Sequence, residues 1–190
     1  MEQNELYPIF LKTKQLEILI VGGGFVALEK LTFLLKSSPN SKVTMVATFF
    51  REETQALANK FGIQMVINKY DSSFLKNKYM VIATTDNVHV NVQVYKDCKQ
   101  RNVLVNVADN PPYCDFFMGG IVTKGNVKIA ISTNGKSPTT AKRLRQFFEE
   151  IIPEDINELV QNLNKYRKKI KGSFENKVVQ LNQLTKSLIN

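Results

Sequence analysis

The chain has 190 residues, with 26 Lys and Arg against 17 Asp and Glu, so its formal net charge is +9. Its 43% hydrophobic and 23% charged residues are typical of a globular protein with a buried core, which excludes disordered, collagen-like and coiled-coil chains. The length fits one or two domains, and the basic charge predicts an anionic partner: a nucleic acid, a membrane face or a polyanionic small molecule.

Several further classes are excluded by short patterns. No apolar stretch reaches the roughly 18 residues of a transmembrane helix, and MEQNELYPIF at the N-terminus lacks the features of a secretory signal. Cys98 and Cys114 give no disulfide framework and no zinc spacing, so we expect two reduced thiols in a cytoplasmic protein. His89 has no ligand partner at metal-binding spacing, and no metal site is predicted.

The first 109 residues alternate short apolar runs with helix-length segments. Strands are predicted at 16–21, 43–47, 63–67, 80–84 and 103–107, and helices at 25–35, 52–61 and 88–101. Such alternation indicates βαβ units and a parallel sheet covered on both faces. Gly62 stands where a C-terminal glycine cap is expected.

The pattern changes beyond Asp109. Two strand-like runs within 120–132 flank Gly125-Asn126, which predicts a hairpin with a tight turn. The chain then becomes helical, with Ser137 as N-cap, Pro138 at the first helical position and a break at Pro153. The predicted fold class is therefore α/β: a Rossmann-type parallel sheet, followed by a small α+β region and a C-terminal helical region.

The strongest local motif is Gly22-x-Gly24-x-x-Ala27, directly after a strand and at the start of a helix. Gly22 permits the tight turn, Gly24 lets the backbone approach a pyrophosphate, and Ala27 lets the helix pack closely on the strand. The helix N-terminus offers free N–H groups to phosphates. In this context the motif predicts dinucleotide binding.

The acidic residue that commonly binds the ribose after the second strand is missing. That strand ends at Val46-Ala47-Thr48, and the first acids are Glu52 and Glu53, which are predicted to be helical. Thr48 or the backbone can contact the ribose instead. The choice between NAD and NADP is left open by the local sequence.

Two more strand ends carry polar residues toward the same crevice. Thr84 and Thr85 follow the fourth strand, where Asp86-Asn87 can contact a cofactor or cap the next helix. Asp109 follows the fifth strand, where its carboxylate can act as a general base or simply form the turn before Asn110-Pro111-Pro112.

A polar turn leading into a basic helix predicts an anion site. Its candidate residues are Thr133, Asn134, Lys136, Ser137, Lys142, Arg143 and Arg145. A second basic run, at 165–171, is interpreted as a solvated helix face, because one such run does not make a nucleic-acid interface.

In their order along the chain, these motifs resemble the precorrin-2 dehydrogenase family, which includes stand-alone enzymes and the N-terminal modules of siroheme synthases. The resemblance spans about residues 5 to 155 and is carried by YPIFL at 7–11, VGGGFVA at 21–27, ATTDN at 83–87, NVAD at 106–109, CDF at 114–116 and AISTNGKSP at 130–138, with the AKRLR run at 141–145.

The resemblance implies NAD-dependent oxidation of precorrin-2 to sirohydrochlorin in siroheme biosynthesis. It implies Asp109 as the catalytic aspartate and a cofactor site at Gly22, Gly24, Phe25, Val26, Val46, Ala47, Thr48, Thr84 and Thr85. It also implies a homodimer, with an NAD-binding domain at 1–113, a dimerisation region at 114–150 and a helical domain at 151–190. Some members insert ferrous iron into sirohydrochlorin in the same cleft, and the residues leave that activity open. No nucleic acid and no membrane partner is expected.

The chain departs from the family pattern at two places. Met118-Gly119-Gly120-Ile121 replaces an apolar–Pro–Ala/Ser–Ile sequence, and Lys142 stands where arginine is usual. The lysine keeps the charge but loses the bidentate geometry of arginine. No C-terminal methyltransferase module is expected in 190 residues. An alternative function from another class is a regulatory NAD-binding module without catalysis.

Overall fold

The computed structural model describes residues 4–186, which fall into two compact units. The first unit runs to Met118 and also includes Ser132–Ser137. The second unit comprises Gly119–Ile131 and the chain from Pro138 onward. The division into three regions at 1–113, 114–150 and 151–190 stays a prediction.

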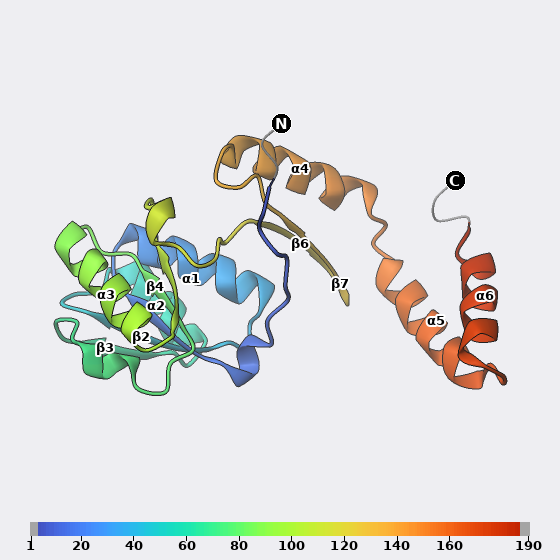
Figure 1. Cartoon of the computed structure of the whole chain (residues 1–190), viewed down its shortest axis with the longest axis horizontal. Coiled ribbons are helices and arrows are strands. Elements are labelled where there is room, and N and C mark those ends of the chain that lie inside the picture. Colours follow the sequence, from blue (N-terminus) through green and yellow to red (C-terminus); the bar gives the residue numbers. More distant parts are fainter. Residues whose placement is uncertain (1–3, 187–190) are drawn as a thin grey trace. The chain divides into compact units, whose positions relative to one another are not determined.

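The first unit is built on one parallel sheet in the order β3-β2-β1-β4-β5 (Figure 1). Its strands are β1 (Glu17–Val21), β2 (Lys42–Ala47), β3 (Gln64–Ile67), β4 (Met80–Ala83) and β5 (Leu104–Val107). Each agrees within one residue at either end with a predicted strand, so the Rossmann-type sheet is confirmed. The strand order reverses between β1 and β4, and in open α/β sheets ligands bind at the carboxyl ends of the strands beside such a point.

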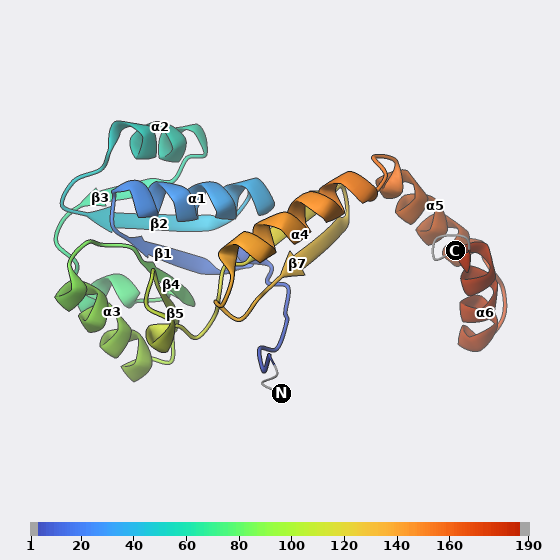
Figure 2. The ribbon, with the colours of Figure 1, turned by 90° about the horizontal axis from the view of Figure 1, so that it is seen from above.

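Helices cover both faces of this sheet (Figure 2). The helices are α1 (Phe25–Ser37), α2 (Glu52–Lys60) and α3 (Val88–Gln100), with short 3-10 turns η1 (Thr13–Gln15), η2 (Ser72–Leu75) and η3 (Pro111–Tyr113). Within β1, Ile18 and Ile20 pack with α1 and α2, whereas Leu19 and Val21 pack with α3. Burial on both faces explains why the strands are continuous apolar runs and not alternating ones.

Two helix ends confirm predictions made from local sequence. Gly62 follows α2 with φ +65°, the left-handed conformation of a glycine after a helix C-cap. Asn87 caps α3, and its side-chain oxygen accepts from the N–H groups of His89 and Val90. Asn87 therefore anchors the loop that joins β4 to α3.

Up to residue 186, the second unit contains an antiparallel hairpin and three helices. The hairpin pairs β6 (Gly120–Lys124) with β7 (Val127–Ile131) through the predicted Gly125-Asn126 turn, where Gly125 has φ +58°. Pro138 opens the first helix as predicted. The helices are α4 (Pro138–Ile151), α5 (Ile156–Lys169) and α6 (Phe174–Leu184). The start of α5 is tied to the turn by Asn157, whose side-chain oxygen accepts from the backbone and side-chain N–H groups of Asn126, both at 2.9 Å.

Helix α4 lies along the hairpin of the second unit (Figure 2). A Cβ on Gly120 would lie only 3.2 Å from the carbonyl oxygen of Ala141, so the missing side chain lets helix and strand approach closely. None of the helices within residues 4–186 has the length and apolar character needed to cross a membrane.

Candidate functional site

The turn from β1 into α1 is shaped by close contact with the end of β4. Gly22 has φ +127°, and a Cβ at this position would lie 2.4 Å from the Thr84 hydroxyl oxygen. The Thr84 hydroxyl and backbone N–H both donate to the carbonyl oxygen of Val21, at 2.9 and 2.8 Å. Gly22 is therefore required by both its backbone conformation and this packing.

Gly23 and Gly24 have opposite surroundings. A Cβ on Gly23 would lie 2.1 Å from the Phe49 carbonyl oxygen, so the loop after β2 packs directly on this residue. A Cβ on Gly24 would meet no atom within 4 Å. Gly24 is also the N-cap of α1, without a side chain that caps the helix. The structure thus leaves room and free backbone N–H groups at the start of α1.

The loop after β2 lies against this glycine turn. Val46 is buried, and its carbonyl oxygen accepts from the N–H of Gly22 at 2.9 Å. Thr48 is exposed at the end of the strand. Farther along, the N–H of Arg51 donates to the carbonyl oxygen of Gly23 at 3.0 Å, and its guanidinium lies 3.5 Å from the centre of the Phe25 ring. Neither Gly23 nor Arg51 was predicted from the sequence to be a site residue.

The loop after β4 is held by Asn91, a residue that the sequence motifs do not include. The Asn91 amide accepts from the Thr85 hydroxyl at 2.7 Å and donates to the Thr85 carbonyl oxygen at 2.8 Å. Asn91 is buried in α3. The sequence gives one weak signal for this role of Asn91, which is its place one turn into the helix that follows a polar strand end. Thr84 and Thr85 thus flank the glycine turn in a fixed conformation.

Asp109 lies at the tip of the turn after β5. It has φ +59°, a left-handed conformation that aspartate tolerates better than most residues. The turn is closed by the Asn110 N–H, which donates to the Val107 carbonyl oxygen at 3.1 Å. Asp109 is exposed, and its carboxylate has no hydrogen bond or ion pair within the described part of the chain. Such a carboxylate is available to an incoming ligand.

The turn that carries Asp109 is tied down by the segment that follows it. The Cys114 thiol lies within 3.2 Å of the Val107 carbonyl oxygen and 3.3 Å of that of Asn110. The Asn106 amide donates to the Phe116 carbonyl oxygen at 2.8 Å. Burial raises the pKa of the Cys114 thiol, so the thiol stays protonated and able to donate to these carbonyl groups.

The predicted anion-site residues of the first unit form a compact turn. The Thr133 hydroxyl accepts from the N–H of Ser137 at 3.2 Å and lies 3.1 Å from the Ser137 carbonyl oxygen. The N–H of Lys136 donates to the Thr133 carbonyl oxygen at 3.0 Å, and Asn134 has φ +54°. Thr133 is therefore engaged in holding the turn.

The predicted basic residues of the second unit lie on α4. Lys142 and Arg143 are exposed, and Arg143 donates to the side chain of Gln146 at 3.1 Å. Arg145 forms an ion pair with Glu149 at 2.5 Å. Arg145 is therefore already neutralised by its own helix, whereas Lys142 has no such partner within the described residues.

Family models match most of the chain. Residues 9–120 match an NAD(P)-binding family, and residues 124–151 match the central region of sirohaem biosynthesis proteins. The chain therefore belongs to this NAD(P)-binding family, and it carries a segment similar to the central region of sirohaem biosynthesis proteins. The resemblance stated from the sequence motifs is thereby confirmed at the level of the family.

The curated relatives of this chain extend well beyond it in length. A siroheme synthase of Pseudoalteromonas atlantica is 36% identical over 90% of the chain, and one of Pseudoalteromonas translucida is 38% identical over 88%. The chain covers only 36% and 35% of those proteins. The solved structure of SirC, a precorrin-2 dehydrogenase, has a TM-score of 0.75 at 23% identity, covering 94% of the chain and 89% of SirC. That likeness shows a shared fold.

The glycine turn of this family member fits a dinucleotide. The space at Gly24 and the uncapped start of α1 suit a pyrophosphate, and the crowding at Gly22 fixes the turn around it. NAD(P) is therefore the cofactor, as predicted from the motif. Within residues 4–186, no group of three or more His, Cys, Asp and Glu side chains is arranged to hold a metal ion.

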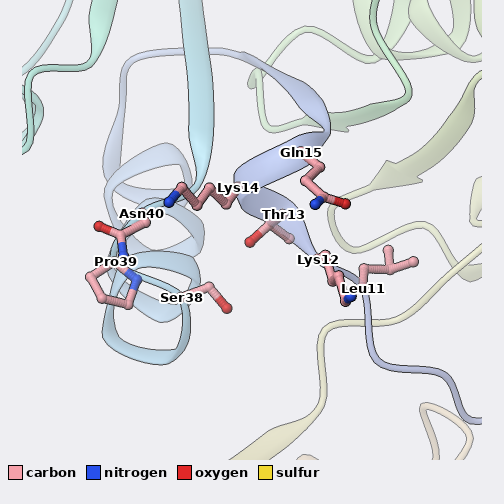
Figure 3. A pocket seen from close by; sticks show the side chains of 8 residues that line it. All are labelled: Leu11, Lys12, Thr13, Lys14, Gln15, Ser38, Pro39 and Asn40. Atoms are coloured by element: carbon pink, nitrogen blue, oxygen red, sulfur yellow. The ribbon is translucent and has the colours of Figure 1, made fainter.

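A separate pocket of about 340 Å³ lies in the first unit (Figure 3). It is lined by Leu11, Lys12, Thr13, Lys14, Gln15, Ser38, Pro39 and Asn40. These residues precede β1 and follow α1, so they lie at the end of the sheet opposite to the glycine turn. None of the predicted cofactor or substrate residues lines this pocket.

Proposed function

We propose that the chain catalyses the NAD-dependent oxidation of precorrin-2 to sirohydrochlorin. The observation that carries the proposal is Asp109, an exposed carboxylate without a partner in the described chain, at the carboxyl end of β5. β5 is next to β4, and β4 is next to β1. Asp109 and the dinucleotide turn therefore both lie at the carboxyl ends of the parallel strands. The name of SirC and its similar fold support precorrin-2 as the substrate.

The reaction removes a hydride and a proton from the reduced tetrapyrrole. NAD, when bound, would supply the acceptor for the hydride. The part assigned to Asp109 is to take the proton and pass it to solvent, which its exposure allows. The Cys114 and Asn106 contacts hold its turn in place, so that the carboxylate meets the substrate in one orientation.

The substrate carries eight carboxylates, and the basic residues of the predicted anion site suit it. We assign its binding to Lys136, Lys142 and Arg143, with Thr133, Asn134 and Ser137 forming the turn. Arg145 contributes less than the sequence suggests, because Glu149 already accepts from its guanidinium. A cationic lining of this kind also explains part of the +9 charge.

A homodimer is the assembly that we propose. The apolar residues of α4 recur at helical spacing, and Leu144, Phe147 and Ile151 are 40%, 52% and 51% exposed. None of the residues of α4 is buried. An exposed apolar stripe of this kind is typical of an interaction surface, and a second copy of the chain would cover it symmetrically.

The proposal is tested by an anaerobic assay with precorrin-2 and NAD, followed by the absorbance of sirohydrochlorin and of NADH. We expect both products to appear in equal amounts. Binding of NAD without turnover of precorrin-2 would instead favour the alternative, a regulatory NAD-binding module. A cytoplasmic location stays a prediction.

Iron insertion is the second activity implied by the family resemblance. The same carboxylate, Asp109, is available to accept protons from pyrrole nitrogens when a metal enters the ring. Ferrous iron is then a substrate and needs no resident metal site. Supplying sirohydrochlorin and ferrous iron without oxygen tests this: formation of siroheme would add the ferrochelatase activity, and its failure would leave a dehydrogenase only.

A further inference from the structure

The loop after β2 places a basic residue near the expected position of the adenosine ribose. β2 ends at Ala47, and the first charged side chain beyond it is Arg51. Many Rossmann folds use an acid in this region to bind the ribose 2′-hydroxyl of NAD, whereas an arginine accommodates the 2′-phosphate of NADP. The chemistry of this loop is thus suited to an additional phosphate.

Two contacts hold Arg51 beside the glycine turn. The backbone N–H of Arg51 donates to the carbonyl oxygen of Gly23 at 3.0 Å. Its guanidinium lies 3.5 Å from the centre of the ring of Phe25, the first residue of α1. Stacking on an aromatic face orients the planar group without using any of its N–H donors. The cation is therefore fixed next to the helix end that fits the pyrophosphate.

The donors of Arg51 are only partly used. Nη2 donates to the carboxylate of Glu53 at 3.2 Å, and the Glu53 side chain is 59% exposed. Nε is buried and, among residues 4–186, is the one buried side-chain nitrogen or oxygen atom without a hydrogen-bond partner. Because Nε is buried, the donors left for a phosphate are those of Nη1 and Nη2, and the Arg51 side chain as a whole is 31% exposed. Two such amino groups can bind a phosphate bidentately. An exposed ion pair such as that with Glu53 is weak, so a phosphate can replace it.

We propose that Arg51 determines cofactor specificity by binding the ribose 2′-phosphate, so that the chain takes NADP as well as NAD. This inference rests on the dinucleotide binding of the proposed function and adds a residue that the glycine motif does not include. The absence of an acid at the end of β2 is then explained, because a carboxylate there would repel the phosphate.

The test compares the dissociation constants of NAD and NADP for the full chain by calorimetry. In Arg51→Gln, we expect NADP to bind about tenfold more weakly, since a hydrogen-bonded charge is lost. NAD should change by less than about twofold, because it lacks the 2′-phosphate. Unfolded protein affects the apparent binding of both dinucleotides equally. The ratio of the two dissociation constants within one variant is therefore independent of any loss of folded protein. Lys60→Gln, a cation at the far end of α2, is the matched control and should leave the ratio unchanged.

A second variant predicts a change of the opposite sign. Glu53→Gln removes the carboxylate that competes for Arg51, so NADP should bind more tightly relative to NAD. An unchanged ratio in Arg51→Gln, or equal losses for both dinucleotides, would overturn the inference while leaving dinucleotide binding intact. Failure of the unaltered chain to bind either dinucleotide would instead contradict the proposed function itself.

Discussion

The first unit buries its apolar side chains on both faces of a sheet, whereas the second leaves the apolar stripe of its helices exposed. Ile18, Leu19 and Ile20 in β1 are each 0% exposed. In the described part of the second unit, the buried apolar residues are Val122, Ile131 and Ile170, two from the hairpin and one from the end of α5. The first unit therefore has an apolar core of its own, whereas most apolar side chains on the helices of the second unit stay accessible to solvent.

This difference separates two roles. A unit with its own core can hold a fixed crevice, and the glycine turn and Asp109 both belong to it. A unit without a sufficient core depends on another surface for stability, as subunits of obligate dimers do. We infer that chemistry belongs to the first unit and association to the second, and the following experiments test this separation.

The largest expected effect is on the chemistry of the first unit. Asp109→Asn removes the proposed base, and general-base catalysis contributes about 10²–10⁴-fold to a rate, so turnover of precorrin-2 should fall by that factor. Asparagine tolerates the left-handed backbone at this position, so the fold and NAD affinity should persist. Glu29→Gln, on the exposed side of α1, is the control. An Asp109→Asn protein with the original rate would remove Asp109 from the mechanism.

Two substitutions of apolar residues, one buried and one exposed, compare the units directly. Leu31→Ala in α1 empties a fully buried site and should lower the free energy of unfolding by about 2–5 kcal/mol. Phe147→Ser in α4 removes a side chain that is 52% exposed, so its main effect should be on association. Denaturant unfolding measures the first change, and sedimentation at several concentrations measures the second. A Phe147→Ser chain that associates as strongly as the original would contradict the assignment of α4 to the dimer interface.

The sequence predicted the first unit well because its signals are local. Each of these signals depends only on residues that are close together along the chain. They are the apolar runs, a glycine after a strand and Asn87 before a helix. The contacts of Gly23 and Arg51 were missed because they join segments distant in sequence, the loop after β2 and the glycine turn. The contact of Asn91 with Thr85 spans only six residues and was missed because an asparagine within a helix gives a weak signal in the sequence. The ion pair of Arg145 with Glu149 could have been read from its spacing of four residues, which is typical of helical pairs.

The three adjacent glycines offer a finer test within the first unit. Gly22→Ala should destabilise the fold by about 2–3 kcal/mol, because it forces a side chain into a conformation reserved for glycine and against Thr84. Gly24→Ala should leave stability nearly unchanged, since its Cβ meets no atom within 4 Å, yet weaken NAD binding by filling that space. Thermal melting with and without NAD measures both. Equal destabilisation by the two variants would show that Gly24 serves packing and not the ligand.

The last test concerns Cys98, a buried residue of the first unit. Burial in the core with Val94 raises the pKa of Cys98 from 9.0 to about 12. Between these values the unfolded thiol loses its proton and the folded one does not, so the stability of the first unit should fall as pH rises from about 9 to about 12.

Denaturant unfolding between about pH 9 and about pH 12 measures this fall in stability, and thiol labelling at pH 8 measures how often the first unit opens. In a Cys114→Ser chain, Cys98 should react with a disulfide reagent only as fast as the first unit opens, because the buried thiol is neutral and inaccessible. Phe147→Ser should leave this rate unchanged if the first unit is stable without the second. A labelling rate that rises when the α4 stripe is disrupted would show that the core of the first unit depends on association, and the separation of roles would then have to be abandoned.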